Sequence, residues 1–162
     1  MLSGECEQSL VQLADFYSQE VQPGTWSLPI DLTPGKEVLL TSVYLNDPNV
    51  MHTVHLHATV GWETAMVKDR MLVPVLTLRV RSGGPAWTDP VVYEVTDSRV
   101  IGAREGDPLL PLSFITAFTT GIPMSTGTGA GRRAYCLTAA LRGIGAVKLT
   151  GPIHFSGMLY TV

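Results

Sequence analysis

Three of the four histidines of the chain and one acid lie in a single short segment, HTVHLHATVGWET, at residues 52–64. In an extended strand His55 and His57 point to the same face, roughly 6 to 7 Å apart, and His52 points to the opposite face. Both imidazoles on the shared face can then reach one ion. The segment therefore indicates either a divalent metal site at His55, His57 and Glu63, or a β-strand whose polar or interfacial face carries histidines.

The His-x-His pair followed by an acid resembles the first metal motif of cupins, which are jelly-roll enzymes. Glu63 follows His57 after five intervening residues, more than the cupin pattern has, and the upstream glycine of that pattern is missing. The segment TGPIH places His154 too soon after Pro152 to supply the second motif. Because a catalytic metal needs about three protein ligands and an open position, the strand interpretation is favoured. We expect no cofactor, and a cupin-like metal-dependent enzyme is the alternative.

Other catalytic patterns are weaker. The chain has no G-x-S-x-G elbow for a nucleophilic serine. The glycine-rich stretch GIPMSTGTGAGRR, at 121–133, lacks the closing Gly-Lys-Ser/Thr of a phosphate loop and precedes an expected strand. We predict that it is a mobile loop that orders against a partner.

The composition predicts one domain that associates with other subunits. The chain has 162 residues, 45% of them hydrophobic and only 15% charged, so few charges cover its surface. Its net charge is −3 and its lysines and arginines are scattered, which argues against nucleic acid as a partner. No apolar run reaches the roughly 18 to 20 residues of a membrane span. The first residues, MLSGECEQSLVQ, do not resemble a secretory signal, so synthesis in the cytoplasm is expected.

The elements that position these side chains are predicted to be strands. From Trp26 onward the segments are short, rich in Val, Leu, Thr and Tyr, and separated by turn sequences such as TPGK and NDPN. This pattern favours an all-β sandwich or barrel over residues 26–162. Residues 1–25 are expected to form an N-terminal extension, partly helical or irregular, with a weak helix at 5–22. Strands are expected at 27–32, 37–45, 54–64, 72–81, 91–96, 113–119, 134–141, 146–149 and 153–160.

Alternation within the strands predicts which faces are buried. In 72–81, Leu76, Leu78 and Val80 share a face that we expect in the core, whereas Thr77, Arg79 and Arg81 face solvent. The last segment, IHFSGMLYTV, is apolar on both faces, with Ile153, Phe155 and Leu159 on one side and Met158, Tyr160 and Val162 on the other. A sandwich can bury one of these faces. The other requires a neighbouring subunit.

The residues FSGMLY, Phe155 to Tyr160, resemble the terminal strand of the globular heads in the complement and tumour necrosis factor superfamily. The resemblance implies an all-β jelly-roll sandwich of about eight to ten antiparallel strands that associates as a tight homotrimer. Phe155, Gly157 and Tyr160 match the motif, and together with Met158 they are the expected interface residues. Bacterial members of this fold occur in the outer layers of endospores.

We therefore expect a non-enzymatic structural or adhesive trimer, deposited on a spore or particle surface and in contact with other surface-layer proteins. A carbohydrate-binding module is a further alternative. In that case Trp62 or Trp87 would be the platform on which a sugar ring stacks.

Overall fold

The structure is a computed structural model that describes residues 11–24, 27–47, 51–65, 71–102, 106, 110–124 and 131–161. These residues form nine strands and no helix, and so contain no helix that could span a membrane. The strands are β1 (Gln12–Val21), β2 (Ile30–Leu32), β3 (Glu37–Asp47), β4 (His52–Thr64), β5 (Val73–Ser82), β6 (Val91–Ser98), β7 (Leu112–Met124), β8 (Gly131–Ile144) and β9 (Val147–Thr161).

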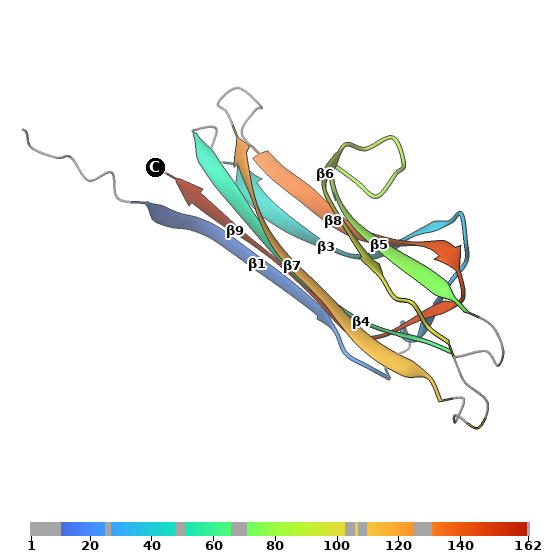
Figure 1. Ribbon diagram of the computed structural model, residues 1–162. Helices are drawn as coiled ribbons and strands as arrows, with labels where there is room; N and C mark the ends of the chain where they lie inside the picture. The colour runs from blue at the N-terminus through green and yellow to red at the C-terminus, as the bar shows by residue number, and fades with distance from the viewer. Residues whose placement is uncertain are drawn as a thin grey trace, which may run out of the picture.

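The eight longer strands pair as a nested series of antiparallel partners: β1 with β9, β3 with β8, β4 with β7, and β5 with β6. The chain is in effect one long hairpin, and its strand pairs are distributed over two sheets, β1-β9-β4-β7 and β3-β8-β5-β6. Short β2 adds to the first sheet beside β9. The two layers are visible in Figure 1. Because this strand order is that of two interlocked Greek keys, the fold is a jelly-roll sandwich, as expected from the sequence.

The core lies between the two sheets and follows the two-residue period of the strands. On β4 every second side chain from His52 to Val60 is buried, and the residues between them are only half-buried. On β5 the expected core residues Leu76, Leu78 and Val80 are fully buried. Burial of these apolar side chains contributes the main stabilising term, about 25 cal/mol for each Å² removed from water.

The helix predicted near the N-terminus is wrong for Gln12–Val21, which forms β1 along the edge of the first sheet. A β-bulge between Leu13 and Asp15 explains the error. Leu13 points outward opposite Tyr160, whereas Tyr17, opposite Gly157, packs against the core, so the apolar residues at helical spacing do not share a face. The bulge also interrupts the two-residue period that would have indicated a strand. Residues 1–10 lie outside the described residues.

Several strand boundaries also differ from the prediction. Segments 146–149 and 153–160 belong to one strand, β9, in which residues 150–152 lie opposite the single residue Gly61 of β4. The expected loop at 121–133 is shorter, because Gly121–Met124 completes β7 and Gly131–Arg133 begins β8. Residues 125–130 lie outside the described part of the chain.

The solvent-facing side predicted for β5 is wrong as well. Thr77 and Arg81 are buried, although they point away from the core. Long side chains of neighbouring strands lie across this surface, as the ion pairs described below show. A strand can therefore be buried on both sides without a third layer of backbone.

Candidate functional site

The side of the β1-β9-β4-β7 sheet that points away from the core carries most of the predicted site residues, and we call it the outer face. Directly opposed residues of neighbouring antiparallel strands point to the same side, so the register defines its rows. Its central residues are Leu13, Phe16, Thr53, His55, His57, Thr59, Thr119, His154, Met158 and Tyr160.

One end of the outer face is apolar. Leu13 and Phe16 on β1 are 56% and 54% exposed, and they lie beside half-buried Tyr160 and Met158 on β9. We call these four residues the apolar patch. The ring of His55 meets that of Tyr160 edge-on, with centroids 5.2 Å apart. A shallow pocket of about 380 Å³ lined by Val11, Thr53, His55 and Tyr160 continues this surface.

The middle of the outer face is polar and contains two neighbouring imidazoles. His57 Nδ1 lies 3.0 Å from Thr119 Oγ1, and His57 Nε2 lies 3.4 Å from Thr59 Oγ1. The ring centroids of His57 and His154 are 5.7 Å apart, and the rings are tilted by 53°. The sequence did not connect these two histidines, because the register between β4 and β9 is needed to place them together.

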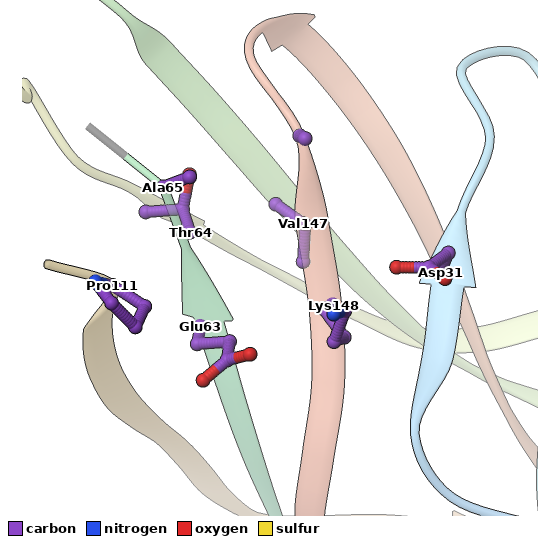
Figure 2. Close-up of a pocket in the computed structure, with 8 residues that line it drawn as sticks. Asp31, Glu63, Thr64, Ala65, Pro111, Val147 and Lys148 are labelled. Carbon is purple, nitrogen blue, oxygen red and sulfur yellow. The ribbon is translucent and has the colours of Figure 1, made fainter. Parts of the chain in front are cut away.

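The far end of the outer face is charged. Lys148 on β9 is the direct cross-strand neighbour of Asp31 on β2 and of Glu63 on β4, as Figure 2 shows. These three residues line a pocket of about 390 Å³, together with Thr64, Ala65, Pro111, Ala146 and Val147. Opposite charges in neighbouring strands stabilise the pairing of β9 modestly.

The structure does not bring the predicted metal ligands together. His55 and His57 share the outer face and His52 points into the core, as expected. Glu63, however, is six residues beyond His57 on the same strand, which is about 20 Å at the rise of a β-strand. Among the described residues no group of three His, Cys, Asp or Glu side chains could hold a metal ion.

Three of the other predicted site residues face the interior of the subunit. Phe155 and Trp62 are fully buried, and Trp62 Nε1 donates a hydrogen bond of 2.9 Å to Thr116 Oγ1. A Cβ atom added to Gly157 would lie 3.0 Å from Leu45 of the opposite sheet, so this glycine permits close packing of the two sheets. Phe155 therefore exposes no surface to another subunit, and Trp62 exposes none to a sugar.

Trp87 is displayed on a braced loop between β5 and β6, with 85% of its surface exposed. The guanidinium of Arg81 donates hydrogen bonds to the carbonyl oxygens of Asp89 (2.7 Å) and Trp87 (3.3 Å). The Asp89 carboxylate in turn accepts a bond from the Ala86 amide at 2.8 Å. The loop thus holds an exposed indole on a backbone fixed at several points.

Sequence reasoning missed an ion-pair cluster on the outside of the second sheet. The Glu37 carboxylate accepts hydrogen bonds from Arg81 (2.8 and 2.9 Å), Arg79 (2.8 Å) and the Thr138 hydroxyl (2.5 Å). Arg79 also pairs with Glu94. The hydrogen bonds from Arg81 are the largest cause that lowers the pKa of Glu37 to about 2, against the opposing effect of burial. Arg79 and Arg81 at alternate positions of β5 were the available signal, with Glu37 on β3 and Glu94 on β6 as possible partners.

No family model and no curated protein matches this chain. Among solved structures, it is similar to a structure of the infectious bursal disease virus Gx strain, with 10% identity over 91% of this chain and a TM-score of 0.38. The infectious bursal disease virus VP2 subviral particle gives 16% identity over 93% of this chain and a TM-score of 0.23. The enzymatically active domain of bacteriophage CBA120 tailspike protein 4 gives 12% over 89%, with a TM-score of 0.26. This chain covers 40%, 40% and 18% of those chains, respectively.

Proposed function

We propose that this chain is a non-enzymatic structural protein whose copies associate as a trimer through the apolar patch on the outer face. The supporting observation is the exposure of Leu13 and Phe16 beside Met158 and Tyr160. The core of a protein interface is typically enriched in aromatic residues and methionine and depleted of charge, and the patch has this composition.

The position of the patch supports the role expected from the sequence. Met158 and Tyr160 belong to the FSGMLY segment, whose resemblance to trimeric globular heads suggested a subunit contact. Leu13 and Phe16 of β1, which lie opposite Tyr160 and Met158, extend the proposed contact, whereas Phe155 and Gly157 pack beneath it. The proposed location is a surface layer, such as that of a bacterial spore, or a particle.

Association can be tested by measuring the mass of the purified chain by light scattering coupled to gel filtration. Wild type is expected at three times the chain mass, and Phe16→Asp at the mass of a single chain, because a carboxylate would be desolvated in the contact. The matched control is Ile144→Asp, since Ile144 is 64% exposed on the other sheet and its replacement should leave the trimer intact.

Circular dichroism should give the same folded spectrum for wild type and both variants, because both positions are mainly exposed. A single-chain mass for wild type at micromolar concentration would contradict the proposal. A trimeric mass for Phe16→Asp would contradict the assigned contact.

The braced Trp87 loop favours a second function, the binding of a carbohydrate. An exposed indole held on an ordered backbone can stack on the apolar face of a sugar ring at a low cost in conformational entropy. A glycan array probed with wild type, Trp87→Ala and Phe16→Ala tests this role. We expect Trp87→Ala alone to lose the signal. No bound glycan for wild type, or equal signals for Trp87→Ala and wild type, would exclude it.

A further inference from the structure

We infer that His57 and His154 form a binding site for a late first-row divalent metal ion such as Zn²⁺, Ni²⁺ or Cu²⁺. The site differs from the three-residue set predicted from the sequence, because its second ligand comes from the neighbouring strand. It is contained within one chain, so it does not depend on the trimer proposed above.

The distance between the two rings suits a shared ion. With a metal–nitrogen distance of about 2.0–2.1 Å, two imidazoles on one ion place their ring centroids up to about 6 Å apart. The observed separation of 5.7 Å between the ring centroids lies within this limit. Both histidines are half-buried on paired strands, so the sheet fixes their backbones and solvent can still reach their rings.

The surroundings of His57 orient its ring. In the tautomer with hydrogen on Nδ1, this nitrogen donates to Thr119 Oγ1 at 3.0 Å and leaves Nε2 as the nitrogen that can bind metal. Nε2 lies on the side of Thr59, and Thr59 is the direct cross-strand partner of His154. Nε2 of His57 is therefore directed toward the row that contains the second imidazole, and a bound ion would replace its 3.4 Å contact with the Thr59 hydroxyl.

The pair of histidines lies beside a carboxylate. Glu20 on β1 is exposed and is the direct cross-strand partner of His154. A nearby carboxylate favours the binding of a cation, although it need not contact the ion. Two imidazoles select late transition metals, whereas Mg²⁺ and Ca²⁺ require oxygen ligands. The remaining coordination positions are open to water.

The test is calorimetric titration of the tag-free, EDTA-treated full chain with Zn²⁺ and Ni²⁺ at neutral pH. Wild type is expected to bind one ion per chain, with no binding of Mg²⁺ or Ca²⁺. His57→Asn and His154→Asn should each abolish binding. Thr119→Val should weaken it about tenfold, because it removes the acceptor that orients His57. His55→Asn is the matched control and should bind as wild type does, since its ring packs against Tyr160.

The spectrum of bound Cu²⁺ provides a second readout that a purely structural role would not change. Electron paramagnetic resonance should show two imidazole nitrogens for wild type and one for either ligand variant. Absence of binding in wild type, undiminished binding in His154→Asn, or an equal loss in His55→Asn would overturn the assignment. The light-scattering mass is measured on the same samples, so failure of the trimer and failure of the metal site are recorded separately.

Discussion

Replacing Glu37 by glutamine is expected to destabilise the fold by an amount that depends on pH. The carboxylate joins Arg79, Arg81 and Thr138 across β3, β5 and β8, and its side chain is only 20% exposed. Glutamine has nearly the same shape but no charge. Arg81, which is buried, would therefore lose its only carboxylate hydrogen-bond partner among the described residues.

The size of this loss in the free energy of unfolding follows from the pKa of Glu37. A decrease from 4.5 to about 2 corresponds to at most about 3 kcal/mol of stability at neutral pH. Because part of the side chain remains in contact with water, solvent screening reduces this value, and we expect about 1–2 kcal/mol. The stabilisation is fully present above about pH 4.5 and is lost as the pH falls toward 2, because over this range the unfolded state, in which the pKa of Glu37 is higher, takes up the proton first.

Urea unfolding of wild type and Glu37→Gln at pH 7, 4 and 2.5 measures this dependence. The difference in the free energy of unfolding should be largest at pH 7 and should fall to about a quarter of that value at pH 2.5. Glu94→Gln is the matched control: Glu94 pairs with Arg79 and is 43% exposed, so its effect should be smaller. A Glu37→Gln difference that stays constant over this range would refute the electrostatic explanation.

Two glycine substitutions test the packing. Gly157→Ala should lower the free energy of unfolding by about 1–3 kcal/mol, because its Cβ would press on the flexible end of Leu45. A melting temperature equal to that of wild type would contradict this contact. Gly61→Ala should be far more damaging, since its Cβ would lie 2.1 Å from the carbonyl oxygen of Gly151, which is backbone. A cooperative thermal transition of Gly61→Ala within a few degrees of wild type would show that the two strands separate easily there.

The fold class could be predicted from the sequence because one physical signal dominates, the alternation of apolar and polar residues along the strands. Alternation in β4 and β5 identified the core face, and proline or glycine turns separated most strands correctly. The signal failed where a bulge interrupts the two-residue period. In β1 the bulge after Leu13 breaks the alternation that would have indicated a strand. In β9 the Gly151-Pro152 pair was interpreted as a strand end, although the strand continues past it.

For the candidate metal site, only the relative positions of residues within one strand could be predicted from the sequence. His55 and His57 were placed on one face because the period of a strand is local, and the same rise shows why Glu63 lies too far away. The partnership of His57 with His154 depends on the register between β4 and β9, which a single sequence does not reveal. The cluster around Glu37 likewise joins three strands whose order in the sheet is set by the whole fold.

The nested pairing of the strands has a consequence for the order of events in the cell. The β5–β6 pair closes across a short loop, whereas β1 must find β9 at the other end of the chain, which is the closure with the largest loop entropy. We expect this pair to form last. Because the apolar patch is divided between β1 and β9, a chain that is still folding has no complete patch, and the proposed trimer would assemble only from finished subunits.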